Sequence, residues 1–199
     1  MTAFNPTAFY GELRRRWGSL KQVQVDDLNA ALAKALGVTS TDPAWMIGAR
    51  KLIGTTEIPG PQHNSAIIRM FARVGYAMYT TDETAWCGAF VGSCFVDCGI
   101  AIPKTAPRAK DWADWGVECE PQLGAVCVMD RDGGGHVTFA AGKTATGAIK
   151  GLGANQRNQV NISDFPFDRI TDWRWPAGVP QAHVPLPIMA AGTVSRNEA

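Results

Sequence analysis

Apolar residues recur at helical spacing in the first half of the chain. They predict helices over residues 44–53 and 65–74, and a longer helix that begins near Trp86. The apolar face of this third helix is formed by Trp86, Phe90, Val91, Cys94, Phe95 and Cys98. Gly99 should end the helix in a Schellman cap, with Ile100 packing back on its last turn.

The pattern changes to short, β-branched and aromatic segments in the second half. A brief helical piece is expected over residues 107–115. Five strands should follow, in the segments GAVCVMD, HVTFAAG, GAIKGLG, QVNIS and ITDWRWP. Strands that come after the helices, instead of alternating with them, predict an α+β fold in which helices pack on an antiparallel sheet.

The two ends of the chain differ from this central block. Residues 1–40 carry two runs of helical apolar spacing with Gly18 between them, which predicts a helical hairpin. Its three arginines, Arg14 to Arg16, are interpreted as a solvated face, with a wall-binding or membrane-approach element as the alternative. The central domain is expected over residues 44–176. The tail, residues 177–199, is rich in Pro, Ala and Gly and is expected to be extended or disordered.

Composition narrows the classes of function. The 199 residues, of which 46% are apolar and 19% charged, suit one globular domain with extensions. A net charge of +1 gives no electrostatic footprint for nucleic acid, so no nucleic-acid partner is expected. No segment has the length and hydrophobicity of a membrane span, and no signal peptide is recognisable. We therefore expect synthesis in the cytoplasm and no stable membrane insertion.

Cys87 and His136 are the candidate catalytic groups. Cys87 lies near a helix start, behind possible caps at Thr81, Asp82 or Thr84, where the partial positive charge of the helix end favours a thiolate. In the segment DRDGGGHVTF, a glycine-rich turn brings His136 to the first position of a strand. An imidazole so placed could take the proton of a nearby thiol and hold an ion pair with the thiolate.

Each of these features also has a structural interpretation. Cys87 could simply pack in the core, as expected for Cys94 and Cys98 on the same helix face, and His136 could be a surface turn residue. The five cysteines show no CxxC pair and no zinc-like spacing, so free thiols and no metal are expected. The DRDGGG segment has the look of a calcium loop but lacks the remaining ligands.

Asn155 is the third candidate. It follows the strand expected to pair with that of His136, so its side chain could orient the imidazole from the neighbouring strand. The alternative is an ordinary turn asparagine, a residue type that tolerates left-handed backbone.

A cysteine at a helix start, a histidine opening a strand and a polar residue one strand later resemble the CHAP family. These are cysteine- and histidine-dependent amidohydrolases/peptidases of phage endolysins and bacterial autolysins. The matching segments are TEIPGPQHNSAII, DETAWCGAFV, GGGHVTF, GANQRNQV and the closing WRWP. The resemblance covers residues 44–176 and implies a papain-like fold with no cofactor. It makes Cys87 the nucleophile, His136 the general base and later the acid, and Asn155 the residue that orients His136 or helps bind the oxyanion.

The sequence departs from the family pattern at one position. Many members carry a glutamate two residues before the asparagine, where this chain has Gly153. Either Asn155 alone orients the histidine, which we favour, or an acid from elsewhere such as Glu57 does so. Trp112, Trp115 and Glu57 are the candidate substrate-binding residues.

The resemblance implies a peptidoglycan hydrolase that cleaves an amide bond in the peptide part of the bacterial cell wall. Both an N-acetylmuramoyl-L-alanine amidase and a stem- or bridge-peptide endopeptidase fit. The expected setting is a monomeric, antimicrobial phage or prophage endolysin, made in the host cytoplasm and acting on the wall or in the periplasm after release. The alternatives are a thiol acyltransferase or deamidase-type effector on the same fold, and a non-catalytic wall-binding component.

Overall fold

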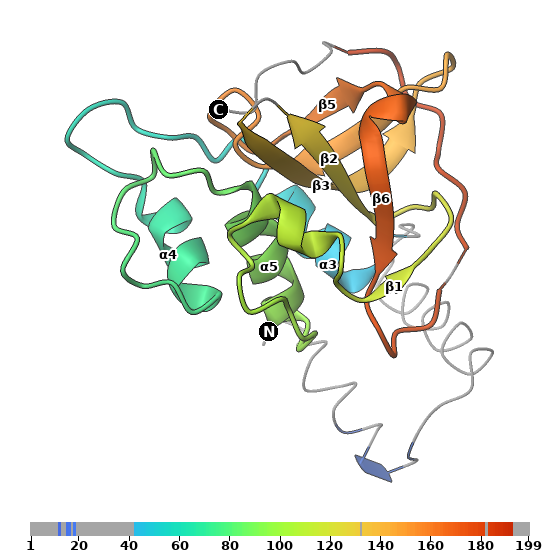
Figure 1. Cartoon of the computed structure of the whole chain (residues 1–199), viewed down its shortest axis with the longest axis horizontal. Helices are drawn as coiled ribbons and strands as arrows, with labels where there is room; N and C mark the ends of the chain where they lie inside the picture. The colour runs from blue at the N-terminus through green and yellow to red at the C-terminus, as the bar shows by residue number, and fades with distance from the viewer. Residues whose placement is uncertain are drawn as a thin grey trace, which may run out of the picture.

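The order of elements along the chain is helices first, then strands (Figure 1). The computed structural model describes residues 42–131, 133–181 and 183–192, together with Glu12, Arg15, Arg16 and Gly18. In this part of the chain the helical elements are α3 (Ala44–Lys51), α4 (Ser65–Arg73), α5 (Cys87–Asp97) and two short 3-10 helices, η1 (Ala109–Trp112) and η2 (Phe167–Arg169). The first four were predicted, with boundaries within a few residues, and η2 was not.

Local capping explains where two of the helices begin and end. The Asn64 side chain accepts a hydrogen bond from the backbone N–H of Ala66 at 2.9 Å and so caps α4. After α5, Gly99 adopts a φ of +68° and Ile100 donates its N–H to the carbonyl of Phe95 at 3.0 Å. This confirms the predicted Schellman cap.

Six strands form one open antiparallel sheet in the order β1-β6-β2-β3-β4-β5. Their bounds are β1 Val117–Glu118, β2 Val126–Arg131, β3 Gly134–Lys143, β4 Ile149–Gly153, β5 Asn161–Phe165 and β6 Ile170–Trp175. The α+β class and five of these strands were predicted. The sixth, β1, has only two residues, both exposed, and therefore carries no hydrophobic alternation.

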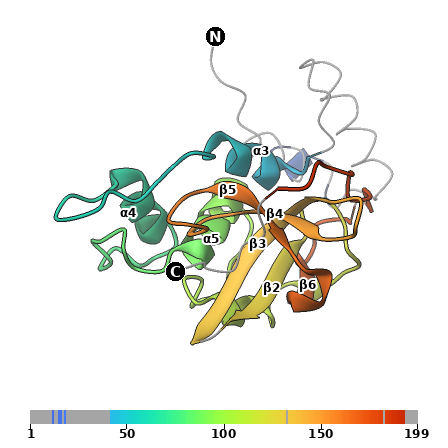
Figure 2. The ribbon, with the colours of Figure 1, turned by 90° about the horizontal axis from the view of Figure 1, so that it is seen from above.

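The helices pack on the sheet in a layer of their own. Both views place α5 and α3 against the sheet, with α4 outside them on α5 (Figures 1 and 2). Phe90 and Phe95 of α5 meet Phe139 of β3, with ring centroids 6.1 and 5.3 Å apart. Each such buried aromatic side chain contributes about 1.5–3 kcal/mol of hydrophobic stabilisation. The core therefore fixes α5 directly against β3.

The chain continues to pack on the domain beyond residue 176. Residues 183–192, here called the C-terminal strap, are extended and contact the ends of β3 and β5. Lys143 donates its N–H to Pro187 and accepts one from Met189, at 2.9 and 2.8 Å. Gly192 donates to the Asp164 carboxylate at 2.7 Å. Asp164 itself forms a buried ion pair with Lys150, at 2.5 Å.

The predicted N-terminal hairpin over residues 1–40 lies outside the described residues, apart from four of its positions. Among these, the helical residue Glu12 pairs with the exposed Arg15 and Arg16, each at 2.9 Å. Within the described part of the chain, every helix is too short or too polar to cross a lipid bilayer.

Candidate active site

Cys87 is the first residue of α5. Trp86 occupies the N-cap position, and no side chain caps the helix there. The expected caps were wrong: the helix starts later than Thr81, Asp82 or Thr84 would allow. Cys87 therefore sits at the helix end itself, where the unpaired backbone N–H groups act most strongly on a thiolate.

The surroundings of the Cys87 sulfur act in two directions. Burial, which leaves the residue 3% exposed, raises the pKa of the thiol above its usual value. A hydrogen bond from the backbone of Val137 lowers this pKa, as do the charge of Arg131 and the N–H groups of Gly88 and Cys87. The net shift of the thiol pKa is upward, which disfavours the thiolate.

Val137 is the residue of β3 that contacts the Cys87 thiol. The pairing of β3 with β4 begins at Phe139 and Leu152, so Val137 lies beyond the end of that ladder. A hydrogen bond from the backbone of Val137 lowers the pKa of the Cys87 thiol, so the two residues are in contact. Since His136 directly precedes Val137, the fold brings the two predicted catalytic residues to the same place, at the junction of α5 and β3.

His136 is the third residue of β3, not the first, because the strand begins at Gly134. Its side chain is inaccessible to solvent, and its ring lies 5.6 Å from that of Phe165. The ring nitrogen Nε2 lies 3.1 Å from Oε1 of Gln156. A buried imidazole held at one nitrogen by a side-chain amide has a fixed orientation.

The contacts of Gln156 determine which ring nitrogen of His136 carries the proton. Its Nε2 faces two backbone carbonyls, those of Asn161 at 3.0 Å and Gly151 at 3.3 Å, so this atom is the NH₂ group. Oε1 therefore points at His136 and can only accept. The His136 Nε2 must donate, so in the neutral ring the other nitrogen, Nδ1, carries the lone pair. This tautomer is the one that can take a proton at Nδ1.

Asn155 lies one residue before this contact. It is 2% exposed and has a φ of +57°. This is the left-handed backbone expected of an ordinary turn asparagine, the alternative interpretation of this residue. The hydrogen bond to Nε2 of His136 comes from Gln156, a residue that sequence reasoning missed. Asn155 and Gln156 are adjacent in the sequence, and which of them faces His136 depends on where β4 ends. The expected roles of Asn155, in orienting His136 or in binding the oxyanion, stay predictions.

The surroundings of Gly153 leave no room for the glutamate that many CHAP members carry at this position. A Cβ there would clash with Oε1 of Gln156 and lie 2.5 Å from Oγ1 of Thr138. The space that a side chain at position 153 would enter is thus filled by the Gln156 amide. The polar group beside His136 comes from three residues further along the chain.

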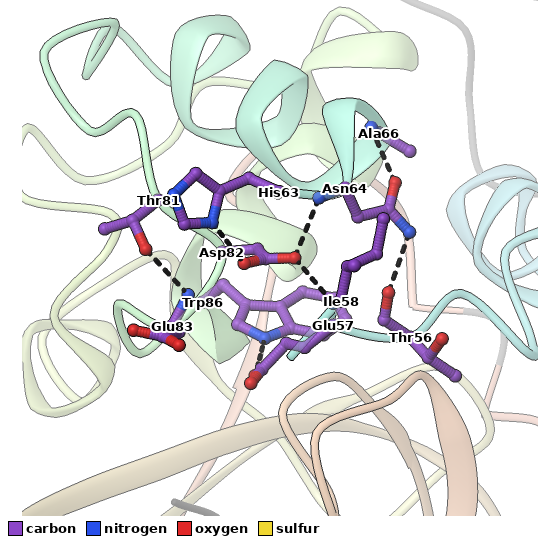
Figure 3. A network of polar contacts seen from close by, with 10 residues as sticks. All are labelled: Thr56, Glu57, Ile58, His63, Asn64, Ala66, Thr81, Asp82, Glu83 and Trp86. Atoms are coloured by element: carbon purple, nitrogen blue, oxygen red, sulfur yellow. Dashed lines mark hydrogen bonds and ion pairs between the residues drawn. The ribbon is translucent and has the colours of Figure 1, made fainter. Parts of the chain in front are cut away.

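Glu57 and Asp82 hold a loop against the start of α5 (Figure 3). Asp82 is inaccessible to solvent and accepts hydrogen bonds from the backbone N–H groups of Ile58 and Asn64 and from Nδ1 of His63, at 2.8–2.9 Å. Burial raises the pKa of Asp82, but these hydrogen bonds outweigh it and the net shift is downward.

Glu57 accepts a hydrogen bond from the indole N–H of Trp86 at 2.7 Å. Burial raises the pKa of Glu57, opposed by this bond and assisted by the charges of Asp82 and Glu83. The carboxylate therefore holds the residue that precedes Cys87, and no described hydrogen bond links it to His136. A part in substrate binding stays a prediction.

Trp112 and Trp115, named above as candidate substrate-binding residues, both pack on the core, and substrate binding by the half-buried Trp115 stays a prediction. Trp112 is inaccessible to solvent and donates its indole N–H to the carbonyl of Ala106 at 2.9 Å, which leaves no surface for a ligand. Trp115 is half-buried, bonded to Ala101 and packed on Phe95 with a centroid distance of 4.7 Å. Aromatic side chains of this size are buried more often than exposed.

The segment around η1 lies against both halves of the site. A Cβ on Gly88 would clash with the carbonyl oxygen of Ala106, and one on Gly135 would lie 2.8 Å from Cγ of Lys110. Lys110 is tied to Asp130 of β2 by an ion pair of 2.9 Å. A surface groove of about 810 Å³ lies elsewhere, between Pro121, Ile149 and Phe167 among others, and none of the predicted site residues lines it.

The described residues contain no group of three or more His, Cys, Asp or Glu side chains that could hold a metal ion. Comparisons of the chain with protein-family models, curated proteins and solved structures give no match.

Proposed function

We propose that this chain is a cysteine-dependent amidohydrolase of the CHAP type with a papain-like fold, which cleaves an amide bond in the peptide part of peptidoglycan. One observation supports it above the others. The Cys87 thiol, at the first position of α5, lies against the backbone of Val137, the residue after His136, and Gln156 holds His136 in the tautomer that a base requires.

The first half of the reaction forms a thioester. Nδ1 of His136 takes the proton of the Cys87 thiol as the sulfur attacks the amide carbonyl, a route that suits a thiol whose pKa is raised by burial. The S–C bond forms and the carbonyl oxygen becomes an oxyanion. The backbone N–H groups of Cys87 and Gly88, which already face the sulfur, are the available donors for it. His136 then protonates the leaving amine as the C–N bond breaks.

Water completes the hydrolysis. His136 removes a proton from a water molecule that attacks the thioester carbonyl, and the thiolate leaves and takes the proton back. The products are a carboxylic acid and an amine, and the protein returns to its starting state. Gln156 stabilises the imidazolium in both halves, because its carbonyl accepts from Nε2–H whether the ring is neutral or charged.

The biological setting that we propose is a phage or prophage endolysin, made in the host cytoplasm and acting on the wall or in the periplasm after release. A monomer suffices for this chemistry, since every proposed catalytic group comes from one chain.

The test is digestion of purified peptidoglycan sacculi by the wild type, Cys87→Ala, His136→Ala and Cys94→Ala, followed by turbidity and mass spectrometry of the fragments. Cys94 is the matched control because it is a buried cysteine on the same helix. We expect clearing by the wild type and by Cys94→Ala only. The new termini distinguish the amidase from the endopeptidase. The proposal would be overturned if the wild type were inactive on several wall types or if Cys87→Ala were active. A new amide in place of a free carboxylate would indicate acyl transfer.

A further inference from the structure

Asn161 holds Gln156 at both its side chain and its backbone. Nδ2 of Asn161 donates to the carbonyl of Gln156 at 2.7 Å, and Oδ1 accepts from Nε2 of Gln156 at 2.8 Å. Ser163 adds a third contact by donating its hydroxyl to the same Oδ1, at 2.7 Å. Asn161 opens β5 and pairs with Gly153 at the end of β4, so this side chain closes the turn that carries Gln156.

The donor and acceptor atoms in these hydrogen bonds can be assigned without ambiguity. The backbone carbonyl of Gln156 can only accept, so the atom of Asn161 that faces it is the NH₂ group, and Oδ1 is the remaining oxygen. Both hydrogens of the Gln156 amide then have acceptors on Asn161, its carbonyl at 3.0 Å and its Oδ1. The asparagine side chain fits both contacts because its amide offers an NH₂ donor and a carbonyl acceptor together.

Rotation of the Gln156 amide by half a turn would reverse its effect on the histidine. The NH₂ group would then face Nε2 of His136, which could only accept, and the neutral ring would carry its proton at Nδ1. A proton at Nδ1 prevents that nitrogen from taking one from a thiol. The rotated amide would also place its oxygen against the two carbonyls of Asn161 and Gly151, which cannot donate.

We infer that Asn161 is a positioning residue that fixes the orientation of the Gln156 amide and, through it, keeps His136 in the Nε2–H tautomer. The inference rests on the proposed function for its catalytic consequence, but its structural part does not. Asn161 contacts neither the thiol nor a reacting atom in this scheme; it acts through the amide between them.

Nitrogen NMR of ¹⁵N-histidine-labelled protein tests the tautomer directly, with the signals assigned by His63→Gln and His183→Gln variants. We expect the Nε2–H form for His136 in the wild type and a mixture with the Nδ1–H form in Asn161→Ala.

Kinetics on a soluble wall peptide test the consequence for catalysis. The kcat of Asn161→Ala should fall roughly ten- to hundredfold, by analogy with residues that orient a metal-binding histidine through a hydrogen bond. KM should change little, and the pH profile of kcat should be displaced. Asn161→Asp keeps the acceptor but loses the donor, and should lie between the two.

Ile162→Val is the matched control, because Ile162 is the next residue of β5 and packs against the core. It should lower stability by about 1 kcal/mol and leave the tautomer and the pH profile unchanged. The inference is overturned if Asn161→Ala and Asn161→Asp keep the wild-type tautomer and profile, or if Ile162→Val shifts them equally. An altered tautomer in a protein that cleaves no wall substrate would instead refute the proposed function alone. Should Asn161→Ala not fold, Asn161→Asp carries the comparison.

Discussion

The carboxylate of Glu57 accepts the indole N–H of Trp86, and Trp86 is the residue directly before Cys87. Trp86 is inaccessible to solvent, so removal of the carboxylate takes the hydrogen-bond acceptor from a buried N–H. Glu57→Ala should therefore lower the free energy of unfolding by about 1–3 kcal/mol, the cost of an unsatisfied buried donor. Urea unfolding at pH 7 measures it.

Glu57→Gln is the control for charge, since its amide oxygen can still accept from Trp86. Burial raises the pKa of Glu57, so ionisation disfavours the folded state, and wild-type stability relative to Glu57→Gln should fall as pH rises from 4.5 through the raised pKa. A difference that grows in the opposite direction would show that the carboxylate is better stabilised than its surroundings indicate.

Asp82 should make the protein sensitive to acid. Its pKa lies below the ordinary 3.8, so its contribution is complete above that value and is lost as pH falls through the lower, folded-state pKa. Asp82→Asn should be less stable at pH 7 by about 3–5 kcal/mol, because three donors lose a charged acceptor. Its stability should also change less than that of the wild type as pH falls from 5 to 2, because the variant has no carboxylate at position 82 to be protonated.

An exposed carboxylate serves as the comparison for Asp82. Asp130 pairs with Lys110 at the surface, with 68% of its side chain exposed. Asp130→Asn should alter the free energy of unfolding by less than about 1 kcal/mol. Thermal or urea unfolding measures both variants. Equal losses of unfolding free energy would count against a special role for the buried acid.

Gly88 should not tolerate a side chain. A Cβ there would clash with the carbonyl oxygen of Ala106 and lie 2.7 Å from that of Pro107. Gly88→Ala should cost about 1–3 kcal/mol of stability, as overpacking does, and displace the helix start from the thiol. Gly48→Ala, within α3 and with no atom near the added Cβ, should instead stabilise by about 0.5–1 kcal/mol. Calorimetry on both variants checks the contrast.

The alkylation of Cys87 by iodoacetamide should follow the titration of a neutral thiol. Burial raises its pKa above 9.0, so labelling, followed by peptide mass spectrometry, should be slow at pH 7 and still increase above pH 9. Cys98 of the same protein, with a pKa of about 11, provides an internal reference. A fast plateau between pH 6 and 8 that His136→Ala abolishes would show a thiolate–imidazolium pair at rest.

Helix α5 and the strands of the sheet could be predicted because burial imposes a local period on the sequence. The apolar face that includes Trp86 and Phe95 marked the helix, and Gly99 marked its end. The helix and its cap depend on residues close together in the chain. Cys87 and His136 are far apart in the chain, and the expectation that they meet came from the resemblance to the CHAP family.

The parts that could not be predicted depend on non-local contacts or on a single-residue register. Asp82 resembles a helix cap in the sequence, but its partners are Ile58 and Asn64, which lie on a distant loop. The turn after β4 contains three non-glycine residues with positive φ, including Asn155, and in such a turn strand alternation no longer tells which side chain faces the neighbouring strand. The choice between Asn155 and Gln156 was therefore beyond periodicity.

The C-terminal strap bears on how this domain could be recombined with others. It covers the Lys150–Asp164 pair and supplies two hydrogen bonds to the end of β3. A chimera that joins its next module after Trp175, the last residue of the sheet, would uncover a charged pair that water does not reach in the native fold. A junction placed after Gly192 keeps the pair enclosed, so the unit that can be exchanged intact is longer than the sheet that gives it shape.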